Sequence, residues 1–229
     1  RKLYIADGHH RYETALNYRN YCRENGISKP GDPQDFQMIY LVDMEHPGLV
    51  VFPTHRLVRD LPNFDKEAVL EKCSEFFYID EKEGTDTMEE DLKKLYDEGK
   101  KAFGFYCGKG EWFLLTLKNI DIMSQMLPNV SKASQSLDVS VLHTLILEKI
   151  FGIDKENMAK QINLTYTKFF TEAIDGVDKG EFQCSFVLNP TRVTEIRDVA
   201  AAGEKMPQKS TYFYPKMITG MVMNNLGVD

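Results

Sequence analysis

The sequence predicts a mixed α/β protein, with a mixed sheet or sheets and helices packed around them. Apolar runs of strand character are interspersed with helical periodicities, without the strict alternation of a doubly wound parallel sheet. Residues 102–117 predict an aromatic-rich β-hairpin around Gly108-Lys109-Gly110. Hydrophobic residues make up 42% and charged residues 28% of the 229 positions, as in ordinary globular proteins. A chain of this length and composition is able to bury a sizeable core.

In the N-terminal half, each element is predicted from its periodicity and from its flanking turn residues. Helices are expected where apolar residues recur at helical spacing, over about residues 12–25, 65–77 and 87–98. Strands are expected where apolar residues run together, at residues 3–5, 36–44 and 49–52. The run 36–44 ("FQMIYLVDM") is so apolar that we expect it to be well buried. The charged run "EKEGTDTMEEDLKK", residues 81–94, is expected to face solvent.

In the C-terminal half, residues 138–151 predict a strongly apolar helix that Asp138 or Ser136 caps and Gly152 ends. A strand is expected at residues 182–188, followed by a helix at 191–202 that Gly203 closes. Two short strands are expected near the end, at residues 211–214 and 221–223.

The chain begins inside a strand-like run without a methionine, so we expect the C-terminal portion of a longer chain. Residues 1–229 are expected to form one compact domain, with a sub-boundary near 119–136 as the alternative. The missing N-terminal part of the same chain is then an expected partner. No stretch approaches the roughly 20 consecutive apolar residues that a membrane helix needs.

Charge and cysteine usage restrict the function classes. The net charge of −7 argues against a broad nucleic-acid surface, which needs many lysines and arginines to displace counterions from phosphate. The four cysteines are scattered and form no CxxC pair, at Cys22, Cys73, Cys107 and Cys184. This pattern predicts reduced thiols and a cytoplasmic protein.

The stretch "IADGHHRYETAL", residues 5–16, places several polar groups where a strand is expected to turn into a helix. The free amides and the dipole of a helix N-terminus attract anions there. Arg11 adds a planar fork that fits phosphate or carboxylate. We therefore expect an anion to bind at residues Gly8, His9, His10 and Arg11. Asp7 is expected to bind a ligand hydroxyl or a metal-bound water. The alternative is that Asp7 caps the helix and the histidines face solvent.

A second candidate is "GEKMPQKS", residues 203–210, which nearly matches the phosphate loop G-x-x-x-x-G-K-[ST]. Gln208 stands where the second glycine is required, so we reject a Walker motif. Gln208, Lys209, Ser210 and Thr211 remain candidates for phosphate binding. The alternative is a surface loop that leads into an edge strand.

Two further sites carry histidine. His55 and Arg56 follow a strand and Pro53, where binding residues often gather, although a solvent-facing pair is equally expected. His143 flanks the apolar stripe of its helix. It is either a hydrogen-bonded residue at the edge of the core or, beside a cleft, an acid–base catalyst.

The histidines lack metal-ligand spacing, so we expect no structural metal. A nucleotide-borne Mg²⁺ needs only one or two carboxylates, for which Asp7 and Asp138 are candidates.

The segment "ADGHHRYETA" resembles the signature turn of the ParB/sulfiredoxin-like superfamily. More closely, the chain is similar to a bacterial and archaeal family catalogued as domain of unknown function 1015. That similarity rests on "IADGHHRYETAL", "PTHRLV" at 53–58, "DVSVLHTLIL" at 138–147 and "GEKMPQKSTYFYPK" at 203–216. The resemblance implies a ParB/sulfiredoxin-like element at the N-terminus and phosphate binding by residues 8–11. Gly8 and His9 stand where the sulfinic-acid reductase has its cysteine, which argues against that reaction.

The superfamily also includes a serine kinase, and the resemblance implies ATP or ADP as the ligand. We expect a nucleotide-dependent phosphotransferase that acts on a small metabolite. Lys209 is expected to stabilise the charge of the transition state, and Asp7 or His143 is expected to act as the base. The alternative is a nucleotide-sensing or partner-binding regulatory domain without turnover. A DNA-associated protein, by analogy with ParB, is disfavoured by the charge. We further expect residues 8–11 and 207–211 to converge on one pocket, with the tips of Arg11 and Lys209 within roughly 10 Å.

Overall fold

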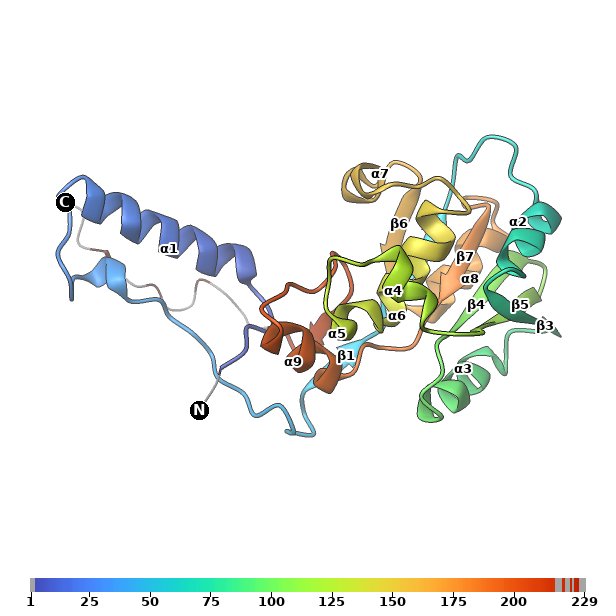
Figure 1. Cartoon of the computed structure of the whole chain (residues 1–229), viewed down its shortest axis with the longest axis horizontal. Coiled ribbons are helices and arrows are strands. Elements are labelled where there is room, and N and C mark those ends of the chain that lie inside the picture. Colours follow the sequence, from blue (N-terminus) through green and yellow to red (C-terminus); the bar gives the residue numbers. More distant parts are fainter. Residues whose placement is uncertain (1–2, 217–219, 221–222, 224, 227–229) are drawn as a thin grey trace. The chain divides into compact units, whose positions relative to one another are not determined.

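The computed structural model describes residues 3–216, 220, 223, 225 and 226 (Figure 1). The chain divides into two compact units, the first comprising Arg1–Val50 with Phe213–Asp229 and the second Val51–Tyr212. The sequence predicts a single domain with an alternative boundary near 119–136, and that segment lies within the second unit. Each unit is described by itself below.

The first unit is built around α1 (His9–Glu24). This helix begins directly after Gly8 and ends at Asn25, so it starts about one turn earlier than the sequence indicates. The 3-10 turn η1 (Pro33–Asp35) is fastened to it, because the guanidinium of Arg23 donates to both carboxylate oxygens of Asp35 at 2.8 and 2.7 Å. Residues 3–6 form no strand, so the strand predicted at 3–5 is wrong.

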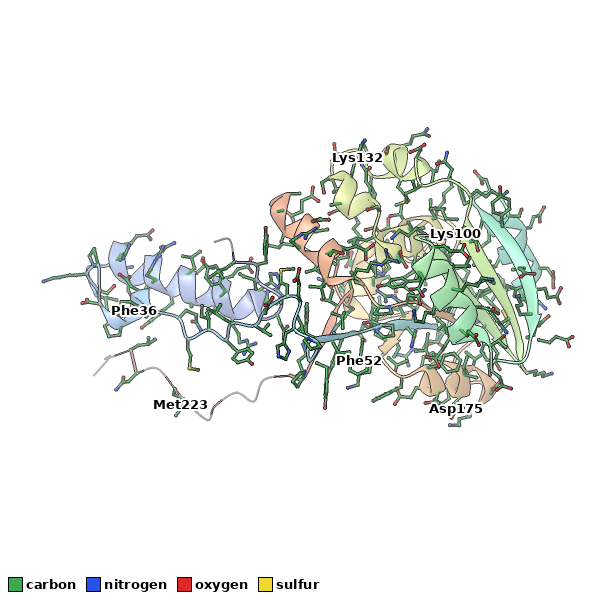
Figure 2. All side chains as sticks on the ribbon, turned by 90° about the horizontal axis from the view of Figure 1, so that it is seen from below. Phe36, Phe52, Lys100, Lys132, Asp175 and Met223 are labelled. Atoms are coloured by element: carbon green, nitrogen blue, oxygen red, sulfur yellow. The ribbon has the colours of Figure 1, made fainter. Side chains whose placement is uncertain are left out.

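The buried strand predicted at residues 36–44 is also wrong. Residues 36–43 have no regular secondary structure, and their apolar side chains are exposed. Phe36, labelled in Figure 2, is 64% exposed and Tyr40 is 67% exposed. A strand needs a hydrogen-bonded neighbour, and this segment belongs to neither of the two sheets that the described residues form. Its apolar composition therefore does not by itself make it a strand.

The second unit contains a six-stranded antiparallel sheet in the order β3-β5-β4-β7-β2-β6. Its strands are β2 (His55–Val58), β3 (Phe77–Glu83), β4 (Ala102–Gly108), β5 (Glu111–Leu117), β6 (Leu164–Thr167) and β7 (Cys184–Val187). The β4–β5 pair confirms the predicted hairpin, whose turn needs positive φ at Gly108, Lys109 and Gly110. The predicted strand at 182–188 is confirmed as β7. Strands β2, β3 and β6 are not predicted by the sequence.

Helices cover both faces of this sheet. They are α2 (Lys66–Cys73), α3 (Met88–Asp97), α4 (Ile122–Met126), α5 (Lys132–Gln135), α6 (Asp138–Val141), the π-helix η2 (Leu142–Glu148), α7 (Lys155–Lys160), α8 (Phe170–Asp178) and α9 (Val193–Ala201). Residues of α6 and η2 pack with Val58 and Phe105 in one core cluster. On the other face, residues of α3 and α8 pack with Trp112 and Tyr106. The core thus consists of two layers on either side of one sheet.

The predicted helix at 138–151 is present, but its start differs from the expectation. Asp138 is its first residue, Leu137 holds the capping position, and no side chain caps it. The carboxylate of Asp138 instead lies 2.7 Å from Nζ of Lys101. Gly152 follows with a φ of 71°, as expected for a helix end.

Two short strands, β1 (Val50–Phe52) and β8 (Tyr212–Tyr214), pair with each other in a separate two-stranded sheet. Both are predicted by the sequence. The strand predicted at 221–223 includes residues 221 and 222, which lie outside the described residues.

Among the described residues, no helix combines the length and apolarity that crossing a membrane requires. The predicted mixed α/β class is confirmed.

Candidate functional site

The N-terminus of α1 is formed by residues 8–11, called here the Gly8 turn. Gly8 has a φ of 80°, and a Cβ atom at this position would lie 2.8 Å from Nη2 of Arg11. The glycine therefore permits both the left-handed backbone and the close approach of the guanidinium. The first intrahelical bond runs from the N–H of Tyr12 to the carbonyl of Gly8, at 3.1 Å.

The amides of His9, His10 and Arg11 precede that first helical bond. No side chain caps this end of α1, and its first turn carries no acidic residue. The helix dipole adds partial positive charge at the same point. Amides, dipole and guanidinium together make the Gly8 turn suited to an anion.

Asp7 does not cap the helix. Its carboxylate accepts a hydrogen bond from Nζ of Lys216 at 2.8 Å, within the same unit. Partial burial alone would raise the pKa of Asp7, but the hydrogen bond and charge of Lys216, the N–H of Gly8 and the charge of Arg11 lower it. Asp7 is therefore an ionised, half-exposed carboxylate beside the turn.

A surface hollow of about 490 Å³ adjoins the Gly8 turn. It is lined by His10, Arg11, Thr14, Ala15, Tyr18, Gln37 and Leu226, all of the first unit. Four of these residues follow the i, i+3, i+4, i+7 spacing of a single helix face, so the hollow runs along α1 for about two turns. Its volume falls within the usual range for small-molecule sites. The His10 side chain is fully exposed, with Nδ1 3.6 Å from the Glu13 carboxylate.

His55 and Arg56 belong to β2, whose residues are all buried, so the alternative of a solvent-facing pair is wrong. Nδ1 of His55 accepts the N–H of Leu188 at 3.2 Å. Burial, with the nearby charge of Arg56, lowers the pKa of His55 to about 4. The His55 imidazole is therefore neutral at ordinary pH and links β2 to the residue that follows β7.

The side chain of Arg56 is 0% exposed. Its guanidinium donates to the carbonyl of Thr54, to the carbonyl of Lys209 at 3.1 Å and to Nε2 of His143 at 3.1 Å. The ring of Tyr166 lies 5.3 Å from the guanidinium carbon. Nε has no hydrogen-bond partner among the described residues. Burial lowers the pKa of Arg56 to about 10, so the group stays charged near neutral pH.

The segment 207–211 is held against Arg56 by its backbone. Lys209 has a φ of 53° and an exposed side chain, while its carbonyl faces the guanidinium. The hydroxyl of Ser210 donates to the carbonyl of Pro207 at 2.6 Å, and the Ser210 carbonyl accepts from Thr191 at 3.0 Å. Gln208 is exposed and Thr211 is half-buried. Ser210 therefore already uses its single hydroxyl proton within the loop.

The structure thus brings together residues of three predicted motifs in the second unit: Arg56, His143 and the backbone of Lys209 and Ser210. Sequence reasoning missed Tyr166, and it missed Thr14, Tyr18 and Lys216 in the first unit. The i+3 and i+7 spacing of Thr14 and Tyr18 from Arg11 is a signal that could have indicated their shared helix face. Arg11 and Lys209 belong to different units, and their convergence on one pocket stays a prediction.

Neither carboxylate proposed for Mg²⁺ is without a cation partner. Asp7 pairs with Lys216, and Asp138 pairs with Lys101, which also contacts Glu195 at 3.0 Å. Burial raises the pKa of Asp138, against the opposing effect of Lys101. In the described part of the chain, no group of three or more histidine, cysteine or acidic residues has a metal-binding arrangement.

Several solved structures are similar to this chain. One is a conserved hypothetical protein from Pyrococcus furiosus, which is 19% identical to this chain with a TM-score of 0.45. The match covers 91% of this chain and 68% of the Pyrococcus furiosus protein. A free serine kinase in complex with AMP has 16% identity and a TM-score of 0.46, and a mutant of it in complex with ADP has 15% and 0.47. Each covers 91% of this chain, which spans 66% of theirs.

Among curated proteins, no sequence matches the chain. A family model does match: the one described as "Protein of unknown function (DUF1015)" covers residues 1–140, more than half of the chain. The chain belongs to the DUF1015 family.

Proposed function

We propose that the chain binds the phosphate groups of ATP or ADP at the Gly8 turn and transfers a phosphoryl group to a small metabolite. One observation carries the proposal: the N-terminus of α1 is uncapped, and Arg11 lies against Gly8 at that same point. Amides and guanidinium together match the oxygens of a phosphate. The adjoining hollow, with Tyr18 in its lining, leaves room for the rest of a nucleotide.

Phosphoryl transfer depends mainly on positioning and on stabilisation of charge. In this proposal Arg11, His10 and the amides of the Gly8 turn hold the phosphates and offset their negative charge. Asp7 is the better candidate for the base, because it is half-exposed, whereas His143 is largely buried with Nε2 engaged by Arg56. A nucleotide-borne Mg²⁺ would find in Asp7 one hard oxygen ligand beside the turn.

The second candidate function is a nucleotide-sensing or partner-binding regulatory domain without turnover. It is favoured by the engagement of both candidate bases, Asp7 with Lys216 and His143 with Arg56. A sensor needs the anion site of the Gly8 turn but no free base. Binding without product formation is the result that separates it from a phosphotransferase.

The test is an assay for transfer. The chain is incubated with ATP or ADP, Mg²⁺ and a panel of hydroxyl-bearing metabolites, and phosphorylated products are followed by ³¹P NMR. AMP and ADP, which solved free serine kinases bind, define the first nucleotides to include. We expect product with the parent chain and none above background with Asp7→Asn. Nucleotide binding without any product would favour the sensor, and no binding at all would contradict both the phosphotransferase and the nucleotide sensor.

A further inference from the structure

Two arginines of the second unit have similar neighbours but different electrostatic surroundings. The guanidinium carbon of Arg56 lies 5.3 Å from the ring centre of Tyr166, and that of Arg192 lies 3.9 Å from the ring centre of Tyr96. Each guanidinium also donates a hydrogen bond to a backbone carbonyl. Arg192 has acidic neighbours, because its charge acts on the carboxyl of Asp138 and its backbone N–H bonds Glu195. The partners of Arg56 are two carbonyls and an imidazole, all neutral.

A buried charge is normally paired with an opposite charge, because removing an ion from water is costly. Carbonyl oxygens and an imidazole nitrogen satisfy hydrogen bonds of the guanidinium, but they do not neutralise its charge. Among the described residues, no carboxylate accepts a hydrogen bond from Arg56, and Nε bonds to nothing. The hydrogen-bond donors of Arg56 are therefore suited to an anion, which would also neutralise the charge of the guanidinium.

The contacts around Arg56 differ in how readily they can move. Strand β2 lies between β7 and β6 inside the sheet, so the backbone that carries Arg56 is fixed. The segment 207–211 is not part of the six-stranded sheet, and its Lys209 carbonyl accepts a hydrogen bond from the guanidinium. Lys209 adopts the left-handed region at a φ of 53°, which costs a non-glycine residue about 1 kcal/mol. Releasing this segment would relieve that strain.

We propose that Arg56 is the receptor for an anionic group, a phosphate or a carboxylate, which binds where the segment 207–211 covers the guanidinium. An oxygen of this group replaces the Lys209 carbonyl on the guanidinium and supplies the negative charge. Lys209 belongs to this segment, and its exposed ammonium group attracts the same anions. The proposal does not rest on nucleotide binding at the Gly8 turn.

The test measures anion-dependent stability of the second unit through Trp112, which is the single tryptophan of the chain and is fully buried there. Thermal unfolding of the full chain is followed by tryptophan fluorescence in phosphate, acetate or chloride at equal ionic strength. All variants carry Arg11→Ala, so that the Gly8 turn contributes little. If phosphate binds with a Kd of about 1 mM, 10 mM phosphate raises the Tm by about 3 °C.

Arg56→Gln and the matched control Arg192→Gln are compared in that background. We expect the phosphate or acetate shift to persist in Arg192→Gln and to vanish in Arg56→Gln. A larger shift with phosphate identifies a phosphate group, and a larger shift with acetate identifies a carboxylate. The proposal is overturned if neither anion exceeds chloride, or if Arg56→Gln keeps the full shift.

A second measurement avoids the variant in case Arg56→Gln does not fold. The Nε–H of Arg56 is buried, so its ¹H–¹⁵N NMR signal is protected from exchange and reports directly on an approaching anion. We expect this signal to move as phosphate or acetate is added to the Arg11→Ala chain, and to stay in place with chloride. A signal that does not move with either oxyanion contradicts the proposal.

Discussion

The guanidinium of Arg56 donates a hydrogen bond to Nε2 of His143 across 3.1 Å, joining β2 to the π-helix η2. Because a guanidinium only donates, the imidazole accepts, and His143 is neutral with its proton on Nδ1. Protonation of His143 would place two cations in contact. Burial, and then the charge of Arg56, accordingly lower the pKa of His143 well below its usual range.

The neighbouring His55 makes the unit sensitive to acid. Its pKa is about 4 in the folded chain and 6.5 in the unfolded chain, so between these values the unfolded state binds more protons. The free energy of unfolding should therefore fall as the pH drops from 6.5 toward 4, by on the order of 3 kcal/mol from His55. Urea unfolding followed by Trp112 fluorescence at a series of pH values measures this loss.

The variant His55→Asn keeps an oxygen that accepts the N–H of Leu188 but cannot be protonated in this range. It should unfold with a shallower pH dependence than the parent. His46 offers a matched control, because its Nδ1 also accepts a backbone N–H, that of Gly48 at 3.0 Å, on an exposed side chain. His55→Asn should have a shallower slope than His46→Asn, and equal slopes for His55→Asn and parent would contradict this account of His55.

A pair of glycines separates backbone strain from displacement of Arg11. Gly8 and Gly26 have similar φ values of 80° and 70°, but a Cβ at Gly26 meets nothing within 4 Å. Both Gly8→Ala and Gly26→Ala should destabilise the first unit by about 1–2 kcal/mol. Only Gly8→Ala should also weaken ADP binding, because its methyl group displaces the Arg11 guanidinium. Equal ADP affinities of the two variants would mean that the position of Arg11 is irrelevant to binding.

The sequence is a good guide where the signals are local. The β4–β5 hairpin follows from its turn glycines, and α1 from the Gly8 and Asn25 boundaries. The segment 36–44 shows the limit of such reasoning. Its apolar residues indicate a need for burial, but burial requires a neighbouring segment that covers them, and Phe36 and Tyr40 remain 64% and 67% exposed. Apolarity alone cannot supply that neighbour.

The candidate sites show the same division. Each motif around Arg56 is visible in the sequence, yet nothing local predicts that positions 56, 143 and 209 meet. That contact arises from the pairing of β2 with β6 and β7 and from the packing of η2 on the sheet. The Gly8 turn, by contrast, lies within consecutive residues, so its geometry follows from the glycine and the helix that it begins.

We also expect that no metal supports the fold. The described histidines and cysteines are dispersed and form no ligand cluster, so a chelator should not change the melting temperature. Elemental analysis of the purified chain by mass spectrometry provides the independent measurement. A stoichiometric amount of zinc or iron, together with a lower melting temperature in chelator, would contradict this expectation.

The central claim, that the Gly8 turn binds phosphate, is tested most directly by calorimetric titration of ADP into the parent chain and two arginine variants. Arg11→Ala removes the guanidinium at the turn, a charge-assisted contact worth about 1.5–3 kcal/mol. Arg19→Ala is the matched control, because it removes the same charge from the same helix about 12 Å farther along. We predict that Arg11→Ala weakens ADP binding by about tenfold or more, with Arg19→Ala close to the parent. Equal affinity of the parent and Arg11→Ala would contradict the claim.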